Sequence, residues 1–198
     1  MKKNLSTILV VVIVVAIVRS IVDRYRYGTF MHFDWMQGMM QSNNGSMMGD
    51  SMMQHTNISS EEEFIKHMIP HHQEAVDTAS RLTAMTQNPE LKELTANIVT
   101  AQENEIAMMN GRVQRRYATG TLEIAYQPMM RDTSSLNAIT TIEKMRLEDM
   151  IQHHMGAIMM AKGVLKLSPR AEVEAFAKNV IAAQSAEIAQ MQKMLKSY

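Results

Sequence analysis

The chain repeats part of its own sequence. Residues 64–113 align without a gap with residues 146–195, so that residue i corresponds to residue i + 82, and 14 of the 50 aligned positions are identical. The identical pairs are Met68/Met150, Ile69/Ile151, His71/His153, His72/His154, Ala75/Ala157, Ala79/Ala161, Glu90/Glu172, Asn97/Asn179, Ala101/Ala183, Gln102/Gln184, Glu105/Glu187, Ile106/Ile188, Ala107/Ala189 and Met109/Met191. Similarity at a fixed spacing is typical of a duplicated structural unit. Both halves should therefore fold alike and place equivalent side chains at equivalent positions.

Each repeat has the pattern of two helices joined by a turn. Ser60 precedes three consecutive glutamates, which is typical of a helix start. From Met68 onward, apolar and histidine positions recur about every 3.6 residues, which gives the helix one buried face. Asn88-Pro89 and Ser168-Pro169 are expected to end one helix and begin the next. We predict that residues 58–198 form an all-α, ferritin-like four-helix bundle built from two tandem hairpins.

The repeat places histidine and methionine on the same helix face. Met68, His71 and His72 are spaced i, i+3 and i+4, and so are their counterparts in the second repeat. In an antiparallel helix pair, residues equally far from the turn lie at equal height. This geometry predicts the opposed pairs His71/Glu105, His72/Gln102, Met68/Met109, His153/Glu187, His154/Gln184 and Met150/Met191.

A buried imidazole or carboxylate is costly unless it is paired. These side chains could therefore form a structural layer in which each His bonds to Glu or Gln. Their duplication, with methionines one turn away, favours a metal-binding layer instead, because imidazole and thioether together suit copper. The candidate ligands in the bundle are His71, His72, His153, His154, Met68, Met109, Met150 and Met191. Whether Met155, Met159 and His67 also act as ligands is left open by the pattern.

Composition narrows the possible chemistry. The chain has no cysteine, which excludes disulfides, thiolate metal sites and cysteine nucleophiles. It has 22 methionines and seven histidines, so thioether and imidazole are the available soft ligands. Lys and Arg (20) balance Asp and Glu (20), and this charge balance argues against a nucleic-acid partner.

The N-terminal segment 1–27 has the pattern of a membrane-targeting sequence. Lys2 and Lys3 precede an apolar run from Leu5 to Val18, which resumes briefly after Arg19. Because no small-residue cleavage motif follows, we expect an uncleaved signal anchor with the bundle on the periplasmic or extracellular side. If the segment is cleaved, the protein would be secreted into the periplasm.

Residues 28–57 form a polar, methionine-rich stretch without helical or strand periodicity, and we expect a disordered tether. Thioethers at close spacing in such a chain can surround a soft monovalent ion such as Cu(I). The candidate ligands are Met36, Met39, Met40, Met47, Met48, Met52 and Met53. An ordinary flexible linker is the alternative.

The doubled motif resembles a known family. His71-His72-Gln73-Glu74-Ala75 and His153-His154-Met155-Gly156-Ala157, with Gln102-x-x-Glu105-Ile106 and Gln184-x-x-Glu187-Ile188, are similar to the bacterial domain of unknown function 305 and its CopM-type periplasmic copper-binding members. The resemblance covers about residues 58–198. It implies a ferritin-like bundle, export, and copper binding or copper resistance through His and Met. It assigns ligand roles most directly to the four histidines, then to Met68 and Met150.

Three functions are compatible with the sequence. The first is a non-enzymatic protein that sequesters copper or hands it to a copper transporter or chaperone. The second is a di-iron enzyme, which needs Glu-x-x-His on two helices; that motif does not occur in this chain. The third is a membrane-tethered structural or interaction bundle that binds no metal.

Overall fold

The computed structural model describes residues 58–117, 125–167 and 169–198. The predicted anchor at 1–27 and the predicted tether at 28–57, with its seven candidate methionines, lie outside these residues. Within the described ranges, no helix combines the length and the apolar character needed to span a bilayer.

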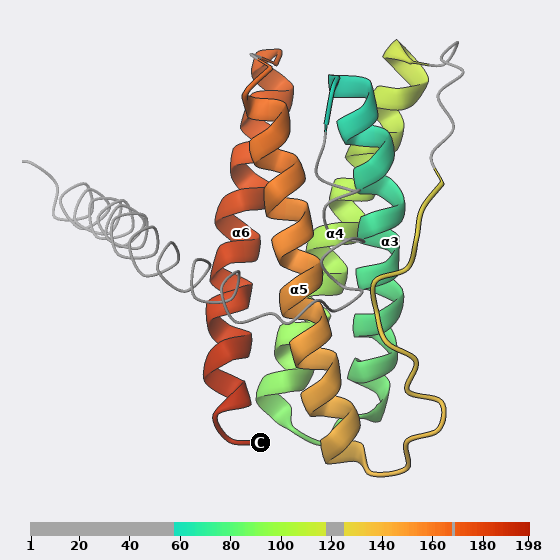
Figure 1. Ribbon diagram of the computed structural model, residues 1–198, viewed down its shortest axis with the longest axis vertical. Coiled ribbons are helices and arrows are strands. Elements are labelled where there is room, and N and C mark those ends of the chain that lie inside the picture. Colours follow the sequence, from blue (N-terminus) through green and yellow to red (C-terminus); the bar gives the residue numbers. More distant parts are fainter. Residues whose placement is uncertain (1–57, 118–124, 168) are drawn as a thin grey trace, which may run out of the picture. The chain divides into compact units, whose positions relative to one another are not determined.

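Four long helices make up the described structure, which contains no strand in these ranges (Figure 1). They are α3 (Glu61–Met85), α4 (Pro89–Arg116), α5 (Ile139–Leu165) and α6 (Ala171–Leu195). The predicted all-α four-helix bundle is thereby confirmed for this part of the chain.

The first hairpin begins and turns where the sequence indicates. The Ser60 side chain accepts a hydrogen bond from the backbone N–H of Glu63 at 3.1 Å and caps α3. Asn88 accepts from the N–H groups of Glu90 and Leu91 and caps α4, whose first residue is Pro89. The second turn differs, because α6 begins at Ala171 and its capping residue Arg170 makes no side-chain cap.

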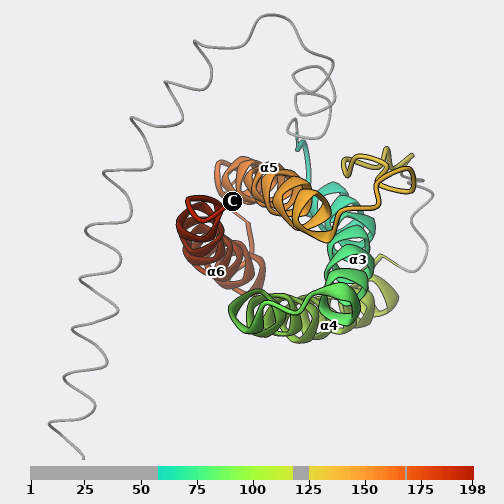
Figure 2. The ribbon, with the colours of Figure 1, turned by 90° about the horizontal axis from the view of Figure 1, so that it is seen from below.

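The hairpins α3–α4 and α5–α6 pack against each other mainly through α3 and α5. Within each hairpin the helices are antiparallel, whereas α4 and α5 run in the same direction (Figure 1). The connection before α5, described from residue 125, therefore returns along the length of the bundle. Seen from below, this connection lies on the outside of the bundle beside α3 (Figure 2).

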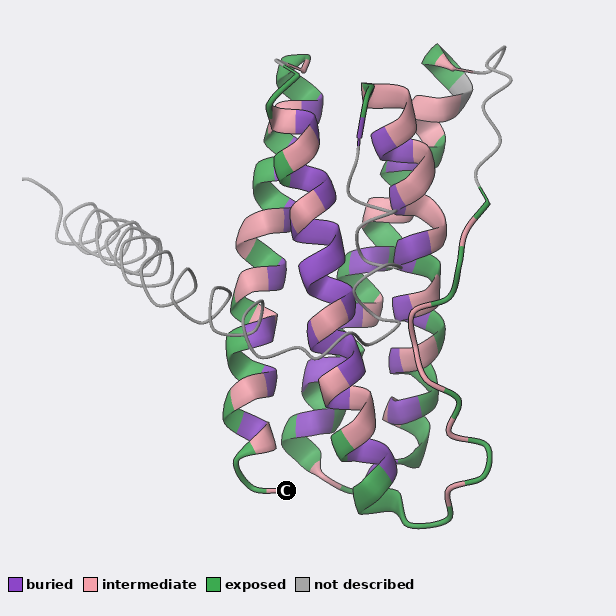
Figure 3. Cartoon of the chain, in the orientation of Figure 1, coloured by how far each residue is buried: buried purple, intermediate pink, exposed green. Residues whose placement is uncertain are grey.

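The buried faces of the four helices meet along the bundle axis (Figure 3). Near one end, Phe64 and Phe176 bring their ring centroids to 5.9 Å. They belong to a cluster of buried apolar side chains that also includes Met68, Met109 and Val164. Next to this cluster, His71 and His72 on α3 and His153 and His154 on α5 are buried although they are polar.

Candidate metal site

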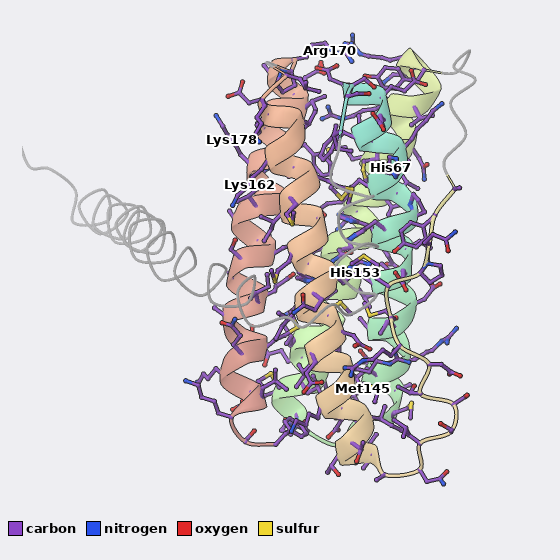
Figure 4. The ribbon with its side chains drawn as sticks, viewed as in Figure 1. His67, Met145, His153, Lys162, Arg170 and Lys178 are labelled. Carbon is purple, nitrogen blue, oxygen red and sulfur yellow. The ribbon has the colours of Figure 1, made fainter. Side chains whose placement is uncertain are left out.

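All four histidines of the repeat are buried within the bundle. His72, His153 and His154 have no exposed area and His71 is 1% exposed. His71 and His72 come from α3, and His153 and His154 from α5. His153 lies near the middle of the bundle's length (Figure 4). The predicted histidine layer is therefore formed at the contact between the two hairpins.

The two inner histidines of this layer touch across that contact. The ring centroids of His71 and His153 are 3.7 Å apart, and the ring planes are tilted by 34°. The outer histidines turn toward their own hairpin partners. His72 Nε2 lies 2.7 Å from Glu105 Oε2, and His154 Nε2 lies 2.7 Å from Glu187 Oε2.

These contacts correct the predicted pairing. We predicted that His71 lies opposite Glu105 and His153 opposite Glu187. Instead, His72 pairs with Glu105 and His154 pairs with Glu187. Distance from the turn fixes height along the axis, and one residue changes it by only about 1.5 Å. Successive residues differ by about 100° around the helix, so only one of two adjacent histidines can face the hairpin partner. The other faces the neighbouring hairpin.

Glu74 is a member of the site that the sequence did not assign. Its Oε2 lies 3.4 Å from His153 Nε2. Burial alone would raise the pKa of Glu74, but the interaction with His153 and hydrogen bonds from Tyr126 and two backbone N–H groups lower it to about 2. Burial lowers the pKa of His153 to about 4, against the opposing effect of Glu74. Near pH 7, therefore, a neutral imidazole faces a carboxylate.

Several buried polar atoms of the layer lack a hydrogen-bond partner among the described residues. They are Nδ1 of His72, His153 and His154 and the side-chain amide atoms of Gln102 and Gln184. An unsatisfied buried polar atom costs about 1–3 kcal/mol, so each one in a folded protein calls for an explanation. Except for His153, these atoms occur in pairs related by the repeat.

The predicted methionine ligands in the bundle are all buried. Met68 and Met109 belong to the same apolar cluster. Met150 and Met191 are 3% and 1% exposed. These methionines could serve either as core packing or as ligands. Among the described residues, no three His, Asp or Glu side chains lie close enough together to form a metal site. A metal in this layer would need thioether, amide or backbone ligands or a small shift of side chains.

A four-helix bundle with a duplicated buried His/Glu layer defines the structural class of this protein. The chain belongs to the DUF305 family, a domain of unknown function, whose model matches residues 26–113 and 61–195. The second match spans all four helices, so the resemblance suggested by the doubled motif is confirmed. The first match extends into residues 26–57, which we had expected to lie outside the family pattern.

Solved structures of this family are similar to the bundle. CopM in its Cu(I)-bound form is 31% identical, with a TM-score of 0.62 over 71% of this chain and 98% of that chain. CopM in its Cu(II)-bound form is 32% identical, with a TM-score of 0.60 over 69% and 95%. A DUF305 fragment from Deinococcus radiodurans is 25% identical, with a TM-score of 0.61 over 72% and 99%.

One curated protein also shows local similarity. An uncharacterized protein of Acanthamoeba polyphaga mimivirus is 32% identical over 56 residues, which is 28% of this chain. The match spans 37% of that protein's length.

Proposed function

We propose that this protein binds copper in the histidine layer of its bundle and serves to sequester the ion or hand it on, without catalysing a reaction. The observation that carries the proposal is the set of buried, partnerless polar atoms. His72 Nδ1 and His154 Nδ1 offer nitrogen ligands in equivalent positions of the two repeats, and the amide atoms of Gln102 and Gln184 are buried and partnerless in the same way. A bound ion would satisfy nitrogens that otherwise remain unpaired.

The carboxylates support a ligand role for the outer histidines. Metal-binding histidines commonly donate their second ring N–H to a carboxylate, which fixes the ring and the tautomer. Glu105 and Glu187 are placed to accept from Nε2 of His72 and His154, which leaves Nδ1 as the lone-pair nitrogen. A purely structural layer would be expected to pair both nitrogens of each buried ring.

These ligand types bind copper more favourably than they bind harder metal ions. Imidazole nitrogen and thioether sulfur are the ligand types available along this part of the core, and thioether favours Cu(I) over hard cations. The similar protein CopM has been solved with Cu(I), Cu(II) and Ag bound. Cu(I) is therefore the ion we propose first, with Cu(II) as a second form at the histidines.

The proposal includes the place where binding occurs. We propose that residues 1–27 hold the bundle at the outer face of the cytoplasmic membrane and that the methionines of 28–57 collect Cu(I) for it. A copper transporter or chaperone would then be the delivery partner. These parts rest on the sequence pattern of residues 1–57.

The proposal is tested by counting copper bound to the full-length protein. Protein loaded with Cu(I) under reducing conditions should retain copper against a competing chelator. The variant carrying His72→Ala and His154→Ala, which removes both Nδ1 ligands, should bind at least about 10-fold more weakly, because loss even of a group that only orients a ligand typically costs about 10- to 100-fold. Circular dichroism checks that the bundle is still helical.

The matched control is His67→Ala. His67 lies one turn before His71 on α3 but contacts Glu63, 3.8 Å away, near the surface. This variant should bind copper in the bundle like the parent. If the double variant bound copper as tightly as the parent, the layer would be structural only. Iron in protein purified without chelators would instead favour a di-iron protein.

A further inference from the structure

We propose that Met129, which lies outside both repeats, supplies a thioether ligand to His71, and that the two form a binding site for a soft monovalent ion such as Cu(I) or Ag(I). The inference rests on the proposed function, because it adds a ligand to the same histidine layer. It is carried by the position of the connection between the hairpins and by a glycine in the second repeat.

The connection is held to α3 by Glu74. The backbone N–H groups of Met129 and Met130 each donate to Glu74 Oε1 at 2.9 Å, and the Tyr126 hydroxyl donates to Oε2. The two oxygens of this one carboxylate accept all three bonds. The backbone at Met129 is therefore fixed beside the helix that carries His71.

A second carboxylate holds the connection to α5. Asp149, which is 4% exposed, accepts hydrogen bonds from the backbone N–H of Arg131 at 3.1 Å and from Arg131 Nε at 2.5 Å. Glu74 lies three residues after His71 and Asp149 four residues before His153, so both anchors are about one turn from the histidine pair. The segment 126–131 is thus tied to both helices that carry this pair.

Gly156 leaves room at the point where the two proposed ligand atoms meet. If position 156 carried a Cβ, its three nearest atoms would be His71 Nε2 at 3.2 Å, Met129 Cε at 3.6 Å and Met129 Sδ at 3.7 Å. The imidazole nitrogen and the thioether sulfur therefore approach one common point. A small movement of the flexible methionine side chain would let both atoms bind one ion there.

The two repeats differ at this position, so the arrangement around His71 is not repeated around His153. Gly156 occupies the position that Glu74 holds in the first repeat. His153 consequently faces a carboxylate, 3.4 Å away, whereas His71 Nε2 and the Met129 sulfur both lie within 4 Å of the place that a Cβ at position 156 would occupy. Carboxylate oxygen suits harder ions and thioether sulfur suits soft ones. The His71 side of an otherwise symmetrical layer is therefore the side that selects Cu(I) or Ag(I).

The test uses Ag(I) as a redox-stable probe on the full-length protein. Met129→Leu keeps the apolar volume and the backbone hydrogen bonds but removes the sulfur. We expect this variant to bind one Ag(I) fewer per chain than the parent in the presence of a competing ligand. Met130→Leu is the matched control, because Met130 shares the backbone bond to Glu74 but contributes none of the three atoms nearest position 156. It should bind like the parent.

Methyl NMR of protein labelled at the methionine Cε distinguishes the possible outcomes. The signal missing in Met129→Leu identifies Met129, and it should shift when Ag(I) is added to the parent but not to His71→Ala. If Ag(I) shifts the methyl signals of Met68, Met109, Met150 or Met191 while the Met129 methyl stays unchanged, this inference is wrong and the proposed function stands. If Ag(I) perturbs no signal of the bundle, the proposed function is wrong as well.

Discussion

Glutamate at position 74 and glycine at position 156 make equivalent points of the two repeats chemically different. Glu74 contacts His153 and holds the connection, while Gly156 leaves space beside His71. The sequence revealed this difference but not its consequence, because nothing in the pattern indicates that residues 126–131 return to this helix face. The identities of single side chains were thus predictable, whereas their long-range partners were not.

Acid should destabilise the metal-free protein through the pair His153 and Glu74. The pKa of His153 is lowered from 6.5 to about 4, so between these values the unfolded state binds more protons than the folded state. The contribution of His153 to the free energy of unfolding is fully present above pH 6.5 and is lost as the pH falls to about 4. The pKa of Glu74 is lowered from 4.5 to about 2, so its contribution is lost in that lower range.

We therefore expect the free energy of unfolding of chelator-treated protein to fall by up to about 3 kcal/mol between pH 7 and pH 4 because of His153. Urea titrations at a series of pH values measure this change. His153→Gln should flatten the dependence between pH 6.5 and 4. Equal slopes for the parent and His153→Gln would show that His153 is protonated normally in the fold.

Glu105 should matter for metal binding through the imidazole that it orients. Glu105→Ala removes the acceptor 2.7 Å from His72 Nε2, and loss of such a partner typically weakens metal binding about 10- to 100-fold. Glu187→Ala should have a similar effect at His154. Glu103→Ala, at an exposed position of the same helix α4, is the control and should retain parental affinity in a chelator competition assay.

At the level of helices, the residues at which helices begin and turn were predictable, but the rotation of each helix about its own axis was not. Ser60 and Asn88 cap α3 and α4 as their sequence contexts indicate, because capping is a local interaction. The pairing of the histidines was wrong by one residue, because height along a helix follows from counting but direction around it depends on which neighbours pack there. The contact between α3 and α5 decides that direction.

The cap at the first turn gives a stability prediction. Asn88→Ala removes the side-chain acceptor for the N–H groups of Glu90 and Leu91 and should lower the free energy of unfolding by about 1 kcal/mol. Gln87→Ala changes the exposed neighbour in the same turn and should have little effect. Urea unfolding of both variants measures the difference, and equal midpoints would show that the Asn88 cap adds no stability.

For the whole molecule, duplication is the feature that made the fold predictable. A repeat with two helical segments needs a partner for each apolar face, and two copies satisfy one another as a four-helix bundle. Family membership agrees with this result. The predictions for residues 1–57 remain predictions, because these residues lie outside the described structure.

The tether gives the prediction that depends on the entire chain. Replacing Met36, Met39, Met40, Met47, Met48, Met52 and Met53 by leucine should reduce the Cu(I) bound per full-length chain, because leucine keeps the apolar character but has no sulfur. Copper held by the bundle should remain. Equal Cu(I) stoichiometry in the parent and the leucine variant would exclude these methionines as ligands.

Metal binding by the buried histidine nitrogens is tested most directly by ¹⁵N NMR of the histidine rings, recorded before and after addition of Ag(I) to the full-length protein. We predict that the Nδ1 signals of His72 and His154 shift on binding while Nε2 of both rings stays protonated toward Glu105 and Glu187. Ring signals of both histidines that remain unchanged while Ag(I) binds elsewhere in the protein would contradict a metal site in this layer.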